Sequence, residues 1–396
     1  MNCERLMLLK LNRFASFREL NVGLIDKLVC SFVTVVLAFG IFAHELQMTP
    51  DSHAYIQGAV SLMESFQYRF MAGAPITLYP PLTSVFYVPF IWVFGLSTTA
   101  IIACNTVLFA ASSWLIQRFN ISTVLKVAFI LGIFNFHRYA LSEAPWIFLF
   151  VIWLLLVKRN RDFTSGLLSF ALILTRYSSI IILNCYHLVC CIFYPSMRVK
   201  MARRMVIDSA FFLFLKSFVG QGKGHGFGLG LAKFSLAENW FTAYYSLLGV
   251  HWGHFAKRFH AAVDWPILFL LIIIVSFVLF RTAKSDKRDA LVGLLIVHFA
   301  ILIQAVLLSI TYVWDPNGTR YNFWVVLFAI VFLISELRKV LKLAVAAFLI
   351  AGWILVYLPT IPLTVESSVY KNLLGPYEEV TDPDKERKML LHSWEL

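Results

Sequence analysis

Four charged residues in separate parts of the chain could act together on one substrate. Asp51 follows the first apolar segment, Glu143 precedes a later one, Arg176 lies between two others, and Arg320 stands just before another. A charged group in or beside a membrane segment is costly unless it faces water or a partner. A carboxylate can accept a proton from a nucleophilic hydroxyl, or position that hydroxyl. Because the planar fork of arginine matches a phosphate, the arginines could neutralise a departing phosphate group.

Further residues near these four extend the candidate site. Lys223 is a second candidate for binding a donor phosphate, and the other candidates for substrate contact are His53, Tyr55, Arg138 and Tyr321. Lys223 lies in a segment with five glycines in the nine residues 220–228, which is too permissive for a fixed helix. The Gly-Lys-Ser/Thr ending of a Walker loop is missing. The segment is either a mobile flap that closes over a bound anion or a plain flexible loop.

Each of the four principal residues also has an interpretation that needs no chemistry. Asp51 could cap a helix that begins near Ser52, and Glu143 could play a similar part for the helix that follows it. Arg176 could form an ion pair with a neighbouring acid. Arg320 could extend to ordinary lipid headgroups. The sequence leaves both interpretations open for all four.

The sequence offers no convincing metal site. His251 and His254, with His260 nearby, could in principle bind a metal, but histidines of an interfacial aromatic patch are the simpler interpretation. The six cysteines fall in or beside apolar segments or at the N-terminus, so neither a disulfide framework nor a zinc spacing follows. We therefore expect no cofactor and no required metal.

The composition is that of an all-α polytopic membrane protein. Of the 396 residues, 60% are hydrophobic and only 14% are charged, whereas soluble domains carry roughly a quarter charged residues. The net charge of +12 reflects basic loops that face the cytoplasm, so we expect no nucleic-acid partner. We expect a single transmembrane domain over residues 1–360 and a short polar external tail over 361–396.

Recurring apolar runs predict about 11 transmembrane helices. The expected spans are 28–46, 98–117, 121–136, 144–157, 163–175, 177–195, 206–219, 266–280, 290–313, 321–337 and 342–359. The basic N-terminal segment and the basic clusters between spans indicate the cytoplasmic side, so the N-terminus is an uncleaved, cytoplasmic signal anchor.

Counting spans between these clusters orients the remaining segments. The apolar segment 81–96 cannot cross the membrane and must lie along its outer surface. Residues 47–97 then form one external loop with two surface helices, and residues 220–265 form a second large external loop. Segment 163–195 has cytoplasmic basic clusters at both ends, so it is a tight hairpin with Arg176 at its outer turn.

The order of these features resembles the GT-C superfamily of integral-membrane glycosyltransferases. This superfamily includes protein O-mannosyltransferases, aminoarabinose transferases and the catalytic subunit of oligosaccharyltransferase. The similar motifs, ordered over about residues 28–337, are Pro50-Asp51-Ser52-His53-Ala54-Tyr55, Tyr79-Pro80-Pro81-Leu82 to Phe94-Gly95, Ser142-Glu143-Ala144-Pro145, Leu174-Thr175-Arg176-Tyr177 and Arg320-Tyr321. Two features depart from particular branches: Ser52 stands where the mannosyltransferase type often has a second acid, and there is no large soluble C-terminal domain.

The resemblance implies a sugar donor carried on polyprenyl phosphate and displaced with inversion at the anomeric carbon. Asp51 would be the general base, Arg176 and Arg320 would bind the donor phosphate, and Glu143 would help to hold acceptor or sugar. The acceptor would be a lipid, a polysaccharide or a protein. The active site would face the periplasm or exterior of a bacterial inner membrane, as in compact members that decorate the cell envelope.

Two other function classes fit a chain of this composition. A lipid-linked sugar flippase or a secondary transporter often has two inverted halves and charged groups near the membrane midplane. Here the charged candidates gather at one face and no halves are apparent, which favours an enzyme. A polysaccharide polymerase would share the outer arginines and large loops, but it does not require Asp51 ahead of the Pro-Pro element.

Overall fold

The structure is a computed structural model that describes residues 3–43, 46, 50–76, 79–119, 121–138, 140, 142–159, 161–219, 274 and 295–296. Several features expected from the sequence therefore lie outside the described residues. They are the loop 220–265 with its glycines and histidines, most of the spans expected over 266–280 and 290–313, the spans 321–337 and 342–359, the tail 361–396, and the candidates Lys223, Arg320 and Tyr321.

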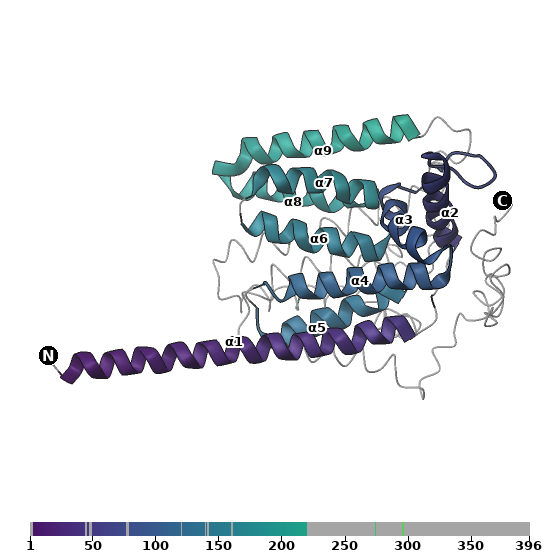
Figure 1. Cartoon of the computed structure of the whole chain (residues 1–396). Helices are drawn as coiled ribbons and strands as arrows, with labels where there is room; N and C mark the ends of the chain where they lie inside the picture. The colour runs from purple at the N-terminus through teal and green to yellow at the C-terminus, as the bar shows by residue number, and fades with distance from the viewer. Residues whose placement is uncertain are drawn as a thin grey trace.

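The described part of the chain is all-helical, and no β-strand occurs in it apart from an isolated bridge between Arg69 and Pro75. Its α-helices are α1 (Cys3–Ala43), α2 (Pro50–Ser65), α3 (Leu82–Phe94), α4 (Thr98–Ile116), α5 (Thr123–Phe134), α6 (Glu143–Lys158), α7 (Asp162–Thr175), α8 (Ser179–Phe193) and α9 (Arg198–Val219). Two short 3₁₀ turns, η1 (Asn135–Arg138) and η2 (Pro195–Met197), join α5 to α6 and α8 to α9. Figure 1 shows α4 to α9 running side by side along α1, with α2 and α3 packed across one end.

The expected helix bounds agree closely with α4, α6 and α7 but not with α1 and α9. Helix α1 extends N-terminally to Cys3, and α9 begins at Arg198 instead of near residue 206. Both extensions contain basic residues and good helix formers such as Leu, Met and Ala, and neither contains proline. Basic residues mark the side of a membrane, but they do not end a helix.

Two described helices are long and apolar enough to cross a membrane. They are Gly23–Ala43 and Thr98–Ile116. In the apolar 18-residue stretch that qualifies each helix, 22% is buried in the first and 50% in the second. On α1 the side chains of Phe32, Val35, Phe39 and Phe42 recur every three or four residues and are all exposed, so they form one apolar stripe. A stripe of this kind suits contact with lipid. Shorter apolar helices, such as α5 and α7, do not reach this length within their described bounds.

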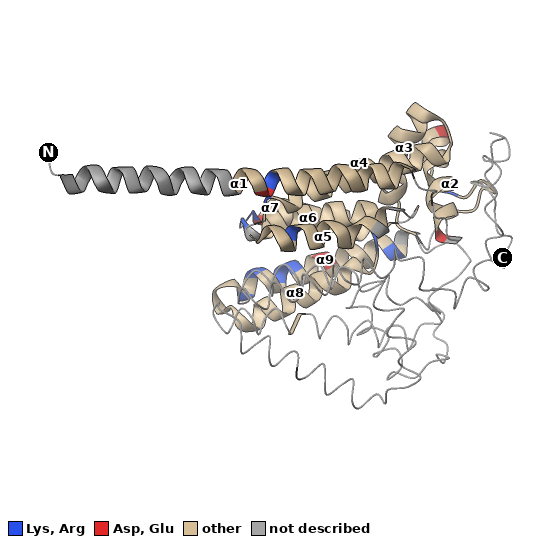
Figure 2. Ribbon diagram, turned by 90° about the horizontal axis from the view of Figure 1, so that it is seen from below, with Lys and Arg blue, Asp and Glu red and all other residues tan. Residues whose placement is uncertain are grey.

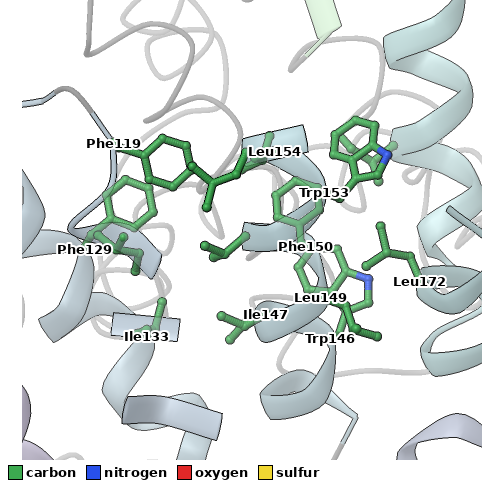
Figure 3. Packing of buried hydrophobic residues seen from close by; sticks show 14 of the residues in the cluster. Phe119, Phe129, Ile133, Trp146, Ile147, Leu149, Phe150, Trp153, Leu154 and Leu172 are labelled. Atoms are coloured by element: carbon green, nitrogen blue, oxygen red, sulfur yellow. The ribbon is translucent and has the colours of Figure 1, made fainter. Parts of the chain in front are cut away.

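The main core centres on aromatic residues of α6. Trp146 stacks on Phe150 with ring centroids 4.6 Å apart, and Phe150 stacks on Trp153 at 5.7 Å. Figure 3 shows these rings facing Phe129 of α5 and Leu172 of α7, among other buried residues. The indole N–H of Trp146 donates a hydrogen bond of 2.7 Å to the Ser179 hydroxyl. The bond satisfies a polar group that burial would otherwise penalise, and it fixes the start of α8 against α6.

A second core cluster attaches α2 and α3 to the bundle. Tyr55 and Ile56 of α2 pack with Tyr87 of α3 and with Ile101 of α4. Most of α2 from Ser52 to Ser61 is buried, so this helix is more enclosed than the surface helix expected from the sequence. Helix α3 is different because Trp92 and its neighbours near the C-terminal end are exposed.

Candidate functional site

Asp51 lies in the first turn of α2 and is half-buried. Its Oδ1 accepts a hydrogen bond of 3.0 Å from the Tyr79 hydroxyl. The helix begins at Pro50, and proline suits a first helical position because its missing N–H has no partner there anyway. Asp51 is therefore inside the first turn rather than at the cap expected for a helix starting near Ser52. Its negative charge is favourable at this positive end of the helix dipole.

Tyr55 connects Asp51 with the start of α6. Its ring meets that of Tyr79 edge-on, with centroids 5.4 Å apart, and its hydroxyl lies near that of Ser142. Burial raises the pKa of Tyr55 well above its usual value, and the carboxylates of Asp51 and Glu143 raise it further. The phenol therefore stays neutral. Two carboxylates that act on one buried hydroxyl belong to the same electrostatic environment.

Glu143 and Arg176 form a buried ion pair. Glu143 is the first residue of α6, Arg176 follows the last residue of α7, and Arg176 Nη1 lies 2.9 Å from Glu143 Oε1. The residues are only 4% and 8% exposed. Arg176 Nε also donates to the Ser178 hydroxyl at 3.1 Å. The pairing of Arg176 with a neighbouring acid, one of the two interpretations of this arginine, is confirmed. Its expected place at the turn of a hairpin is also confirmed.

Helix α3 joins the Asp51 region to the Arg176 region. The Thr83 hydroxyl donates to the backbone carbonyl of Thr175, the residue before Arg176, at 3.2 Å. The next residue, Ser84, donates to the backbone carbonyl of Tyr55 at 2.7 Å. Adjacent residues of α3 thus hold α2 on one side and the end of α7 on the other. The segment that the sequence assigns to the outer membrane surface carries these contacts.

The remaining sequence candidates contribute less to this arrangement. His53 is half-buried on α2, two positions from Asp51, and residues at this spacing do not share one face of a helix. Arg138 ends η1 just before α6, and only its backbone is described. Sequence reasoning missed the Tyr79 and Thr83 side chains as parts of the candidate site. The Tyr79-Pro80-Pro81 motif marks the first of these positions, but no local pattern indicates that its hydroxyl contacts Asp51.

No group of three or more His, Cys, Asp or Glu side chains that could hold a metal occurs among the described residues. The expectation that no metal is required stays a prediction. We compared the chain with protein-family models, with curated proteins and with solved structures, and no match was found. The resemblance to GT-C glycosyltransferases therefore stays a prediction from motifs. The geometry adds a hydrogen-bonded carboxylate and a buried arginine at one end of a helical bundle.

Proposed function

We propose that this protein is a multi-pass membrane glycosyltransferase that uses a polyprenyl-phosphate sugar. The sugar passes to a hydroxyl of a lipid, glycan or protein acceptor. The strongest support is the position of two residues at the same end of the bundle, the half-buried carboxylate of Asp51 and the buried guanidinium of Arg176. Helix α3 contacts the helix of the first and the residue before the second. A transfer that releases a phosphate needs a proton acceptor and a cation within one site.

Asp51 is the general base of the proposed reaction. The acceptor hydroxyl gives its proton to the Asp51 carboxylate while its oxygen forms a bond to the anomeric carbon from the face opposite the phosphate. The bond from that carbon to the phosphate oxygen breaks, and its electron pair leaves with the polyprenyl phosphate, so the anomeric centre inverts. The Tyr79 hydroxyl donates to Oδ1 of Asp51 and so orients this carboxylate.

Arg176 stabilises the charge of the leaving phosphate. A buried guanidinium acts on a phosphate more strongly than one in water because the local dielectric constant is lower. The phosphate must share this guanidinium with Glu143, whose Oε1 lies 2.9 Å from Nη1. Glu143 therefore serves to orient Arg176 in this proposal. That role replaces the direct contact with acceptor or sugar that the family resemblance suggests.

The proposed orientation places the N-terminus in the cytoplasm and the site on the periplasmic or external side of a bacterial inner membrane. Most described Lys and Arg residues lie at the end of the bundle from which the N-terminus projects, as Figure 2 shows. By the helix bounds, residues of this kind at that end include Arg118 after α4, Lys158 and Arg159 at the end of α6, Arg161 before α7, and Arg198, Lys200, Arg203 and Arg204 in the first two turns of α9. Asp51, Glu143 and Arg176 lie at the other end. An excess of basic residues on the cytoplasmic side supports this orientation.

Transfer of radiolabelled sugar tests the proposal directly. Membranes that contain the full-length protein are supplied with a panel of polyprenyl-phosphate sugars, and wild type is compared with Asp51→Asn. We expect transfer to fall by about 10²-fold or more, the usual contribution of a general base. Glu64→Gln is the matched control because Glu64 is an exposed acid on the same helix, and it should retain wild-type transfer.

Two results would overturn the assignment. Substantial transfer by Asp51→Asn would remove Asp51 as the base. Absence of transfer from every donor, together with passage of lipid-linked sugar across reconstituted vesicles, would identify a carrier instead of an enzyme.

A further inference from the structure

A small pocket opens at the end of the bundle opposite the proposed active site. It lies among α6, α7, α8 and α9, and its cavity volume is about 40 Å³, which is room for a few water-sized groups. Its polar and charged lining residues are Asp162, Ser165, Ser169, His187, Lys200 and Arg204. Asp162 begins α7 and Arg176 follows its end, so the pocket and the arginine are about 20 Å apart along this helix.

Two basic side chains of α9 define the charge of this pocket. Lys200 and Arg204 are four residues apart and so share one face of the helix. Lys200 pairs with the Asp162 carboxylate, and Arg204 Nη2 donates to the Asp162 backbone carbonyl. Arg204 lies directly against Gly166, where a Cβ atom would overlap its guanidinium. The absence of a side chain at Gly166 thus provides the space in which Arg204 reaches α7.

The floor of the pocket is a buried polar contact between α8 and α9. His187 lines the pocket, and its Nε2 lies 3.0 Å from Oδ2 of the fully buried Asp208. One turn away, the Asn184 amide donates to the Ser209 hydroxyl at 2.9 Å. Within the described residues, the buried Nδ1 of His187 has no hydrogen-bond partner. These contacts hold α8 against α9 and give the pocket a fixed polar floor.

We propose that this pocket binds the phosphate group of an anionic lipid. Lys200 and Arg204 line the pocket with the Asp162 carboxylate, and the Asp208 carboxylate lies behind His187. The positive end of the α7 dipole adds to the attraction for an anion. Arg161, at the cap position of α7, makes no side-chain capping bond there. Basic pockets between transmembrane helices are suited to anionic headgroups.

The surface beside the pocket favours a lipid over a free phosphate ion. Phe163 follows Asp162 in α7, Val199 precedes Lys200 in α9, and both apolar side chains are strongly exposed. Val206 and Leu213 continue this exposed apolar surface along α9. A lipid whose phosphate is bound in the pocket would thus have its acyl chains beside apolar side chains. The inference rests on the proposed membrane location and does not depend on the transferase activity.

The Asp162 carboxylate competes with the proposed ligand. It already pairs with Lys200, so a phosphate must draw that ammonium group away. Removing the carboxylate charge should therefore strengthen lipid binding, whereas removing either basic group should weaken it. Opposite effects of removing the acidic and the basic charges on lipid binding are expected only if the lipid phosphate binds in the pocket. A general attraction between basic protein and acidic membrane would respond weakly to Asp162.

Native mass spectrometry of the full-length protein in detergent measures the binding of added phosphatidylglycerol. We expect Arg204→Gln to weaken binding about fivefold and Asp162→Asn to strengthen it by a similar factor. Arg203→Gln is the matched control because Arg203 is exposed, is adjacent in sequence and does not line the pocket. It removes the same charge and should leave binding within about twofold of wild type, less than the loss expected from a pocket contact.

The remaining measurements identify the source of the phosphate and guard against misfolding. Inorganic phosphate in excess should leave lipid binding unchanged, and displacement of the lipid by it would show that the site takes free phosphate instead. Equal losses in Arg203→Gln and Arg204→Gln, or no response to Asp162→Asn, would overturn the proposal. If Arg204→Gln does not fold, Lys200→Gln is compared with the same control.

Discussion

Arg176 and Glu143 come from different helices and meet as a buried pair, with 2.9 Å between Nη1 and Oε1. Each charge would be strongly penalised alone at this depth, because burial removes its hydration. As a pair they also fix geometry, since Arg176 follows α7 and Glu143 begins α6. Their contact therefore sets the position of the proposed phosphate-binding arginine as well as the packing of two helices.

Glu143→Gln is expected to destabilise the protein. The substitution keeps the shape of the side chain but leaves the Arg176 charge buried without its counter-ion, which typically costs about 3–5 kcal/mol. Replacing both residues, as in Glu143→Leu with Arg176→Met, should cost less than the two single changes together. The free energy of unfolding in detergent, measured for the two singles and the double variant, checks this. Additive losses would show that the pair is not coupled.

The sequence predicted much of the arrangement around this pair but not the pair itself. Apolar runs placed α4, α6 and α7 nearly where they occur. Arg176 was expected at a turn because segment 163–195 is short and has basic clusters at both ends. The partner of Arg176 depends on how α6 packs against α7, and hydropathy carries no information about such packing. Both interpretations of Arg176 therefore had to stay open until its contact with Glu143 was seen.

The burial of α2 was also beyond the sequence. Its residues are of mixed polarity, and Ser52, Gln57 and Ser61 would suit a solvated surface, yet all three are buried. Helix α3 packs closely against α2, and both contribute to a buried cluster that also contains Ile101 of α4. The polarity of a segment can be read from its sequence, but its burial also depends on which other segments pack against it.

Tyr79→Phe should reduce transfer while leaving the fold intact. The change removes the hydroxyl that donates to Asp51 at 3.0 Å but keeps the ring that meets Tyr55. Loss of a hydrogen bond to a charged group corresponds to about 1.5–3 kcal/mol, and we expect a fall in kcat of about tenfold with little change in KM. Steady-state kinetics with a saturating acceptor measures this split.

Tyr68→Phe is the control, because the Tyr68 hydroxyl contacts the Pro80 carbonyl and not Asp51. Equal losses in both variants would show that the effect is only structural.

Thr83→Val should loosen the contact between α3 and the end of α7. Valine matches threonine in shape but lacks the hydroxyl that donates to the Thr175 carbonyl. We expect a loss of about 1 kcal/mol in stability, as for a typical buried hydrogen bond. Because the accepting carbonyl belongs to the residue before Arg176, we also expect a higher KM for the polyprenyl-phosphate donor. Donor titration and thermal unfolding of the same preparation test the two effects, and an unchanged donor KM would argue against coupling between α3 and Arg176.

Gly58→Ala should disturb α2 more than its small size suggests. A Cβ atom at position 58 would overlap the Tyr68 ring and lie 2.9 Å from the Ser84 hydroxyl, which holds the Tyr55 carbonyl. Overpacking of this kind typically costs about 1–3 kcal/mol, and here it also pushes α3 away from the helix that carries Asp51. Gly132→Ala in α5 is the matched control, because a Cβ atom there would meet none of the described residues within 4 Å. Alanine in place of that helical glycine should stabilise the protein by about 0.5–1 kcal/mol. Thermal unfolding and sugar transfer are measured for both variants. If close packing between α2 and α3 positions the proposed base, the two variants should shift stability in opposite directions. Only Gly58→Ala should then lose transfer. Full transfer by Gly58→Ala would show that Asp51 tolerates displacement of α3.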